Sequence, residues 1–273
     1  MKITLAQKSF TSCDIDLNVN KIIESAHEAK GSSLVIFPEL SVCGVNPYGH
    51  LSDEGFVEKC EEALDRIAVE CEHVAVLVGC PVRNVSGKGK PFYNAAVYMF
   101  QGQRKVFKKK QIGLADKREL DFFEPSDVNE ILQVGCHKFA VTIGSDLYNI
   151  GEDEFLIQNR VDELMTLAPD VIINMASEEF DYQKITRHRN QLRQNVLKTE
   201  RPLVYVNNVG KSEGKVFGGH SMIFGYEGYV VASNPFFEEK VNDVDLVCLI
   251  SMKQSDIQDI PSEKELENLI SKL

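Results

Sequence analysis

The sequence predicts an α/β sandwich, in which two β-sheets pack face to face and helices cover their outer faces. Apolar runs of strand length alternate with amphipathic segments of helical period along the whole chain. Strand candidates are more numerous than one parallel sheet requires, and the phosphate-binding patterns GxGxxG and GxxxxGK(S/T) are absent. No Gly/Ser-rich or Pro-rich linker interrupts the sequence, so residues 1–273 are expected to form a single domain.

The first half of the chain alternates between strand and helix candidates. Apolar runs predict strands at Lys2–Gln7, Ser33–Phe37 and Val74–Cys80, and a hairpin formed by Asn94–Gln101 and Lys105–Lys108. Apolar residues at helical spacing predict one helix from Ile15 to Ala29, with Asp14 as its N-cap, and a second from Phe56 to Cys71.

The second half repeats this alternation. Strands are predicted at Phe139–Ile143, Val171–Asn174, Leu203–Asn207 and Val244–Ile250, with a hairpin over Ser221–Ser233. Helices are predicted around Phe155–Leu167 and Gln183–Lys198, and Ser262 with Glu265 forms a capping box for a terminal helix.

Charge and hydropathy disfavour two classes of partner. The chain has 41 acidic and 30 basic residues, a net charge of −11, and an acidic surface repels phosphate backbones. No apolar run approaches the roughly 18–20 residues of a membrane span. We therefore expect neither nucleic-acid binding nor membrane insertion.

The seven cysteines form no CxxC motif, and the N-terminus does not resemble a secretion signal. This combination is typical of a reduced, cytoplasmic protein. Cys136-His137 stands without a second Cys/His pair nearby, so no metal site and no other cofactor is predicted.

Three places combine polar residues with the ends of predicted strands, where sites in α/β folds commonly lie. Glu39 follows a buried strand among apolar neighbours, which would raise its pKa and suit a general base, although a surface loop glutamate has the same pattern. One of the lysines at 108–110 could point inward and stabilise an oxyanion, whereas a lysine run is usually solvated. Gly144-Ser145-Asp146 could present a nucleophile at a strand end or could be a plain turn.

Taken together, these places resemble the nitrilase, or carbon–nitrogen hydrolase, superfamily. The resemblance is closest to the glutaminase domain of glutamine-dependent NAD synthetases and extends from about Ile3 to Ile250. It rests on the following stretches in order: LAQ at 5–7, VIFPELSVCG at 35–44, PFYNAAVYM at 91–99, FKKKQ at 107–111, FFEP at 122–125, VTIGSDLY at 141–148, DVIINMAS at 170–177, RPLVYVNNVG at 201–210 and FFEE at 236–239. It implies an α-β-β-α sandwich of two mixed sheets.

The resemblance also implies a Glu-Lys-Cys triad, in which glutamate is the base, cysteine attacks an amide or nitrile carbon and lysine holds the oxyanion. The base would be Glu39, the lysine Lys110 with Lys109 as the alternative, and the family's second glutamate Glu119. The remaining matched positions would bind substrate: Tyr93, Asn94, Ser145 and Ser177.

The sequence departs from the family pattern at the nucleophile. The family reads Ile-Cys-Glu-Asp or Ile-Cys-Tyr-Asp, and this chain reads Ile-Gly-Ser-Asp with Gly144 at the cysteine position. Glycine cannot attack a carbon, so we expect a small polar cavity beside Glu39 and the lysine. Other residues are weak candidates to replace the missing nucleophile: Ser145 is one position out of register, and neither Cys136 nor Cys248 stands at the carboxyl end of a strand. If the cysteine had been replaced deliberately, alanine or serine would be the more common choice.

Two functions remain open on the sequence. The first is a catalytically impaired glutaminase or amidase scaffold that binds a ligand or acts as a regulatory subunit. The second is an active amidohydrolase that releases ammonia from glutamine or another small amide by an unexpected nucleophile or by water that Glu39 activates. Glu178 and Glu179 would repel an anionic substrate; they could serve a cationic ligand, but we interpret them as solvated carboxylates. The expected partners are a small amide or glutamine-like ligand, possible pairing with a separate synthetase subunit, and a dimer-based homo-oligomer.

Overall fold

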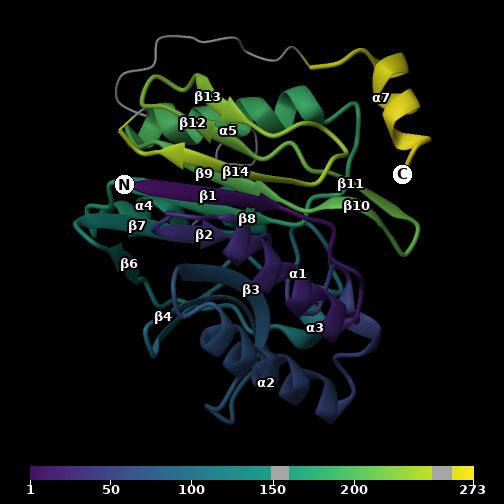
Figure 1. The fold of residues 1–273 in the computed structure, drawn as a ribbon. Coiled ribbons are helices and arrows are strands. Elements are labelled where there is room, and N and C mark those ends of the chain that lie inside the picture. The colour runs from purple at the N-terminus through teal and green to yellow at the C-terminus, as the bar shows by residue number, and fades with distance from the viewer. Residues whose placement is uncertain (149–159, 248–259) are drawn as a thin grey trace.

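The computed structural model describes residues 1–148, 160–247 and 260–273. Two six-stranded mixed sheets stack on each other, and helices lie on their outer faces (Figure 1). The predicted α/β sandwich is therefore confirmed. Among the residues described, no helix is both long enough and apolar enough to cross a membrane, and no group of three His, Cys, Asp or Glu side chains is placed to hold a metal ion.

The first sheet has the strand order β14-β1-β2-β3-β4-β5. Its strands are β1 (Lys2–Gln7), β2 (Leu34–Ile36), β3 (Ala75–Arg83), β4 (Phe92–Phe100), β5 (Gln103–Lys108) and β14 (Lys240–Asp245). The three strands β1, β2 and β3 run parallel, while β14, β4 and β5 are antiparallel to their neighbours. The carboxyl ends of β2 and β5 both lead into the site described below.

The second sheet has the order β13-β12-β9-β8-β7-β6. Its strands are β6 (Ile131–Val134), β7 (His137–Ile143), β8 (Val171–Ala176), β9 (Leu203–Asn207), β12 (Met222–Phe224) and β13 (Val230–Ser233). Strands β7, β8 and β9 run parallel. A separate hairpin, β10 (Val209–Ser212) with β11 (Lys215–Gly218), completes the strands, and the sequence pattern did not predict it.

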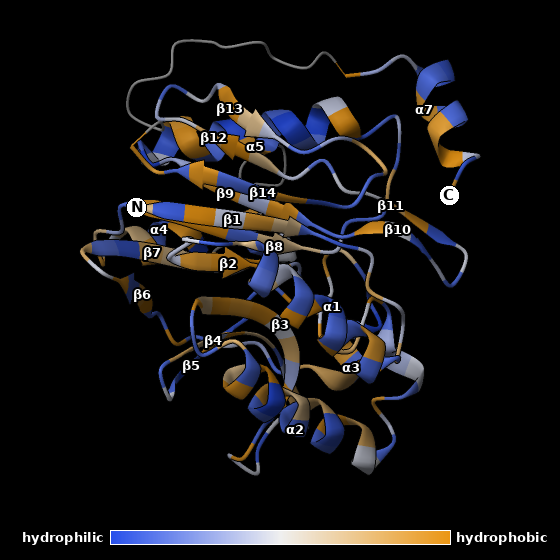
Figure 2. Ribbon diagram, viewed as in Figure 1, coloured by the Kyte–Doolittle hydropathy of each residue, from blue (hydrophilic) through white to orange (hydrophobic). Residues whose placement is uncertain are grey.

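Buried apolar residues form three main clusters, one between the sheets and one between each sheet and its helices; in Figure 2 the strands β2 and β3 are coloured mostly hydrophobic. The layer between the sheets contains residues from both, among them Ile36, Val141 and Ile173. Helices α1 (Ile15–Glu28) and α2 (Glu54–Glu70) pack on the first sheet, and α4 (Arg160–Met165) and α5 (Ile185–Thr199) pack on the second. The terminal helix α7 (Glu263–Ile270) packs through Leu266 on two phenylalanines and begins with the predicted Ser262–Glu265 capping box.

Two predicted elements differ in extent from those observed. The last strand was expected at Val244–Ile250, but β14 spans Lys240–Asp245, and residues 248–250 lie outside the described part. Strand β14 is an edge strand with alternating exposure, so it lacks the continuous apolar run of a central strand. Helix α4 covers only the second part of the predicted 155–167 segment, and residues 155–159 are not described.

Candidate functional site

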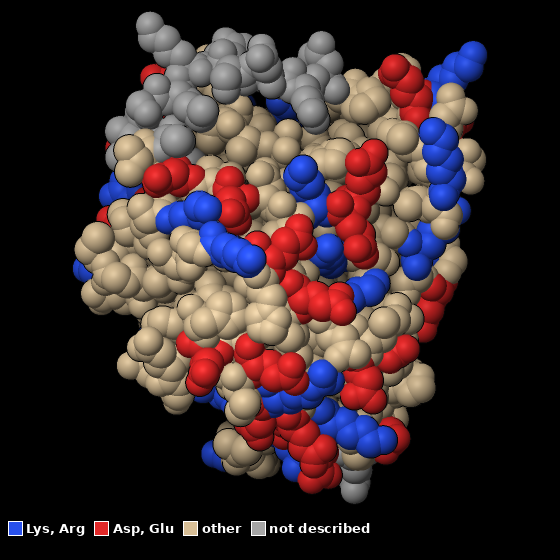
Figure 3. Space-filling view, in the orientation of Figure 1, with Lys and Arg blue, Asp and Glu red and all other residues tan. Residues whose placement is uncertain are grey.

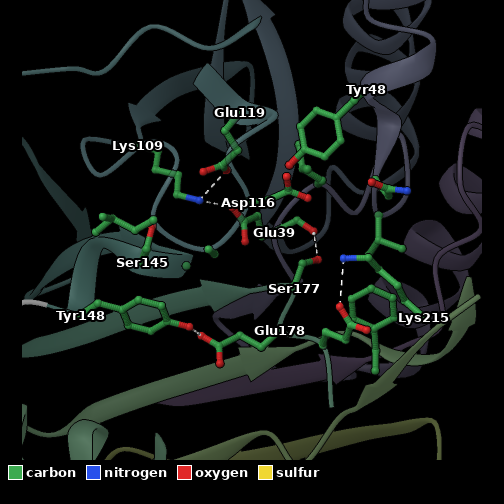
Figure 4. A pocket seen from close by; sticks show the side chains of 18 of the residues that line it. Glu39, Tyr48, Lys109, Asp116, Glu119, Ser145, Tyr148, Ser177, Glu178 and Lys215 are labelled. Carbon is green, nitrogen blue, oxygen red and sulfur yellow. Dashed lines mark hydrogen bonds and ion pairs between the residues drawn. The ribbon is translucent and has the colours of Figure 1, made fainter. Parts of the chain in front are cut away.

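A cavity of about 400 Å³ lies where the ends of β2, β5, β7 and β8 meet. Its walls include Glu39, Lys109, Glu119, Gly144, Tyr148, Ser177 and Glu178. In Figure 4, Lys109 and Glu119 lie on one side and Tyr148 and Glu178 on the other. The polar cavity predicted beside Gly144 is present. Acidic and basic side chains are also interspersed over the molecular face seen in Figure 3.

Glu39 is held in this cavity by the loop that follows β2. The backbone N–H groups of Phe37 and Val42 donate to the carbonyls of Leu77 and Gly79 on β3, at 2.9 Å each. A Cβ at Gly79 would lie only 2.2 Å from Leu40 N, so the loop can cross β3 only where that strand has glycine. The glycine in β3 therefore fixes the position of the carboxylate.

The Glu39 side chain is nearly fully buried and belongs to a cluster of two carboxylates, an amine and an amide. Lys109 Nζ donates to Glu39 Oε1 at 2.8 Å and to Glu119 Oε1 at 2.7 Å. Asn94 Nδ2 donates to Glu39 Oε1 at 2.7 Å. The second oxygen of Glu119 accepts from Gly113 N at 2.9 Å, which holds that glutamate on the cluster.

The cavity lysine is Lys109, so the prediction of Lys110 is wrong and its alternative is the residue in place. Lys109 is 1% exposed and directly follows β5, two positions after Phe107, which packs between the sheets. Lys110 Nζ instead pairs with Glu163 at 2.7 Å and with Asp127 at 3.3 Å. The two adjacent lysines therefore contact different partners, and of the two only Lys109 lines the cavity.

Alternation on β4 separates the predicted pair Tyr93 and Asn94. Asn94 points between the sheets, where it contacts Glu39 and Glu119. Tyr93 packs on the opposite face, beneath Lys108 Nζ at 3.9 Å from its ring centre. The prediction that Tyr93 lines the pocket is therefore wrong. Asn94 contacts the two carboxylates from behind and is not itself part of the cavity wall.

Gly144 begins a turn of 3₁₀ helix, η2 (Gly144–Leu147), directly after β7. Asp146 fixes this turn against the end of β5, because its carboxylate accepts from the backbone N–H groups of Lys110, Gln111 and Ile143 at 2.8–3.0 Å. The backbone of Gly144 has φ +47°, in the left-handed region that glycine adopts readily. A Cβ there would lie 2.8 Å from Glu39 Oε2 and 3.2 Å from Lys109 Nζ.

The two predicted serines are both beside the cavity, and both are already hydrogen-bonded. Ser145 Oγ donates to Gln111 O at 2.7 Å, so its proton is directed away from Glu39. Ser177 Oγ donates to the backbone carbonyl of Glu39 at 3.1 Å, and Asn208 Nδ2 donates to the same carbonyl at 3.2 Å. Ser177 and Asn208 therefore support the glutamate loop from the second sheet.

Of the two cysteines considered as substitutes, only Cys136 lies in the described part of the chain, and it does not line the cavity. Cys136 is exposed in the β6–β7 turn, at the opposite end of β7 from Gly144. Cys248 lies outside the described residues.

Two cavity residues were not predicted from the sequence. Glu178 lines the wall instead of facing solvent; the Tyr148 hydroxyl donates to its Oε1, and His188 Nδ1 lies 3.2 Å from its Oε2. Asp116 is held by its near neighbour Arg118 at 2.5 Å on the loop that precedes Glu119. The contact between Tyr148 and Glu178 joins residues far apart in sequence, so no local motif indicates it.

The carbon-nitrogen hydrolase family matches residues 2–259 of the sequence. The chain belongs to the carbon–nitrogen hydrolase family. The predicted resemblance to this superfamily is thereby confirmed.

Within this family the chain is similar to glutamine-dependent NAD(+) synthetases. It is 29% identical to that of Synechocystis sp. over 87% of this chain and 44% of the relative, and 26% identical to that of Thermotoga maritima over 90% and 42%. The chain thus spans less than half the length of these curated relatives.

Solved structures of other carbon–nitrogen hydrolases share the fold. The glutamine-dependent NAD+ synthetase of Acinetobacter baumannii superimposes with a TM-score of 0.78 at 25% identity, over 93% of this chain and 48% of that one. A variant of the amidase from Nesterenkonia sp. AN1, with the acetamide moiety of fluoroacetamide added covalently at its active-site cysteine, gives 0.77 at 19% identity, over 90% of both chains.

In this member of the carbon–nitrogen hydrolase family, burial raises the pKa of the Glu39 carboxyl above its ordinary value of 4.5. Lys109 opposes the shift and the nearby Glu119 adds to it. The pKa of Lys109 is raised although burial favours its neutral form, because two carboxylates contact one ammonium. The cluster thus holds a protonated lysine beside a carboxyl of elevated basicity.

The raised pKa of Glu39 predicts a pH dependence of stability. Between pH 4.5 and the native pKa of Glu39, the folded protein retains a proton on this carboxyl that the unfolded chain has lost. The free energy of unfolding therefore falls as pH rises through that window, by up to about 1.4 kcal/mol per pH unit, and levels off above the native pKa. Urea denaturation between pH 4.5 and 8 should show a steeper fall for the native chain than for Glu39→Gln. The control Asp127→Asn, which changes an exposed carboxylate, should keep the slope of the native chain. Equal slopes for the native chain and Glu39→Gln would show that the pKa of Glu39 is not raised in the folded protein.

Proposed function

We propose that this carbon–nitrogen hydrolase binds a small primary amide, or a closely similar polar ligand, without hydrolysing it. The observation that carries this proposal is the absence of a side chain at Gly144, at the point on which Glu39 and Lys109 converge. An acyl-enzyme requires a nucleophile at that point. Ser145 is one residue away and is bonded to a backbone carbonyl.

The groups left beside Gly144 suit an amide. Glu39 Oε2 faces the position of the missing side chain and offers an acceptor, while its partner oxygen holds Lys109 and Asn94. Lys109 Nζ has three N–H donors, of which Glu39 and Glu119 take two. One acceptor and one donor complement the NH₂ and C=O groups of a primary amide.

A relative supports binding without the thiol. A variant of the Nesterenkonia amidase with alanine in place of a cysteine has been solved in complex with butyramide. The present chain would carry out the same kind of binding with glycine at the nucleophile position. It would then act as a ligand-binding or regulatory subunit, and the similarity to NAD synthetases makes a synthetase a candidate partner.

The second candidate function is hydrolysis by water. Glu39 has a raised pKa and its Oε2 faces the cavity, which are the requirements for a general base acting on a water molecule. This route lacks the covalent intermediate that divides amide hydrolysis into two easier steps. It is the alternative against which the proposal is tested.

Calorimetry with butyramide tests the proposal, with N,N-dimethylbutyramide as the matched ligand that cannot donate to Glu39. The native chain should bind butyramide and should bind the dimethyl amide at least about tenfold more weakly, because Glu39 loses its donor and the methyl groups crowd Gly144. Ammonia is assayed in the same samples. No binding of butyramide would contradict the proposal, and ammonia release that disappears in Glu39→Gln would establish the water route instead.

A further inference from the structure

The cavity carries more carboxylates than amines on its walls. Its charged residues are Glu39, Asp116, Glu119, Glu178 and Glu179 against Lys109, Lys184 and Lys215. A cavity with this composition attracts cations and repels anions, and the low dielectric of the partly enclosed space strengthens both effects.

Most of these charges already have a partner of opposite sign. Lys215 pairs with Glu179 at 2.9 Å, and Lys184 pairs with Asp181 at 2.8 Å. The lysines on this side of the cavity therefore do not form a free anion site. Glu178 differs from the neighbouring carboxylates, because it contacts the Tyr148 hydroxyl and the His188 ring rather than a lysine or arginine.

Glu178 has aromatic neighbours, of which Tyr148 lines the cavity and His188 and Tyr205 lie outside its wall. The His188 ring lies 6.4 Å from the ring of Tyr148 and 5.1 Å from that of Tyr205, centre to centre. Burial raises the pKa of both tyrosines, and the negative charge of Glu178 raises it further. A carboxylate among aromatic rings is a common arrangement for binding organic cations.

The Glu39 end of the same cavity supplies an independent indication of a ligand. Glu39 is 6% exposed, and its Oε2 is directed at the space beside Gly144. Figure 4 shows Glu39 and Glu178 on either side of Ser177, with Tyr148 beside Glu178. One ligand in the cavity would therefore meet an amide-binding end and a negatively charged aromatic end.

We propose that the ligand is a small amide that carries a cationic group, such as a primary ammonium, and that this group binds against Glu178 and Tyr148. The inference rests on the proposed function, since it assumes that the amide binds at Glu39 and Lys109. The ligand would then be positively charged, and Glu178 would be the residue that selects a cationic amide over a neutral or anionic one.

Matched ligands of two lengths test the inference. The shorter set is 4-aminobutanamide, pentanamide and glutaramate, which differ in carrying an ammonium, a methyl or a carboxylate at the end remote from the amide. The longer set is 5-aminopentanamide, hexanamide and adipamate. Calorimetry at fixed ionic strength is run on the native chain, on Glu178→Gln and on Asp127→Asn, which removes the same charge from an exposed side chain.

In at least one set, the native chain should bind the ammonium ligand about tenfold more tightly than the methyl ligand and the carboxylate ligand most weakly. Glu178→Gln should lose the preference and still bind the methyl ligand, whereas Asp127→Asn should keep it. Equal binding of ammonium and methyl ligands, or a preference that survives in Glu178→Gln, would overturn the inference and leave the proposed function standing. Failure of every amide to bind the native chain would overturn both.

Discussion

Replacing Lys109 by methionine is expected to lower the free energy of unfolding by about 3–5 kcal/mol, because the change leaves two carboxylates in one buried site without their cation. Lys109 is fully enclosed and bonds to Glu39 at 2.8 Å and Glu119 at 2.7 Å. Urea denaturation at pH 7 measures the loss. The double variant Lys109→Met/Glu39→Gln should recover part of the stability, since only one carboxylate then remains.

The matched control is Lys110→Met, the neighbouring lysine. Its partners Glu163 and Asp127 are 29% and 90% exposed, so removal should cost about 1 kcal/mol or less. A larger loss for Lys110→Met than for Lys109→Met would show that the cluster described here is not the buried one.

Replacing Gly144 by cysteine is expected to create a reactive thiol in the cavity, whose described lining residues include no cysteine. The new Cβ would lie between Glu39 Oε2 and Lys109 Nζ, so the thiol would have a base and a cation at hand. The carboxylate of Glu39 must shift, and the φ of +47° disfavours a side chain, so stability should fall by about 1–2 kcal/mol. Intact mass after treatment with fluoroacetamide should show one added acetamide moiety.

Two variants control this experiment. Gly144→Ala introduces the same crowding without the sulfur and should gain no mass. Gly144→Cys/Glu39→Gln keeps the sulfur and should react much more slowly, because the base is lost. Equal labelling of the native chain and Gly144→Cys would place the reactive thiol elsewhere, with exposed Cys136 as the first residue to examine.

The fold could be predicted almost completely from the sequence, because central strands of buried sheets are continuous apolar runs. Strands without that signal were missed or misplaced: the partly exposed hairpin β10–β11 was not predicted, and the edge strand β14 was expected at Val244–Ile250 instead of Lys240–Asp245. Their pairing depends on contacts that are distant in sequence.

The site was predicted less completely, for reasons that concern single residues. Glu39 could be found because it directly follows an apolar strand. Lys109 and Lys110 could not be separated, since a shift of one position in a strand exchanges its two faces and motif spacing does not fix the strand end. Glu178 was interpreted as solvated because its partners Tyr148 and His188 are 30 and 10 residues away in the sequence.

The most direct test of the central claim is ammonia release from a panel of primary amides, including glutamine, butyramide and 4-aminobutanamide, by the native chain and Gly144→Cys side by side. Our account predicts no release above the buffer background for the native chain and measurable release for Gly144→Cys from the amides that bind. Release by the native chain that is lost in Glu39→Gln would contradict the account and show that Gly144 does not silence this site.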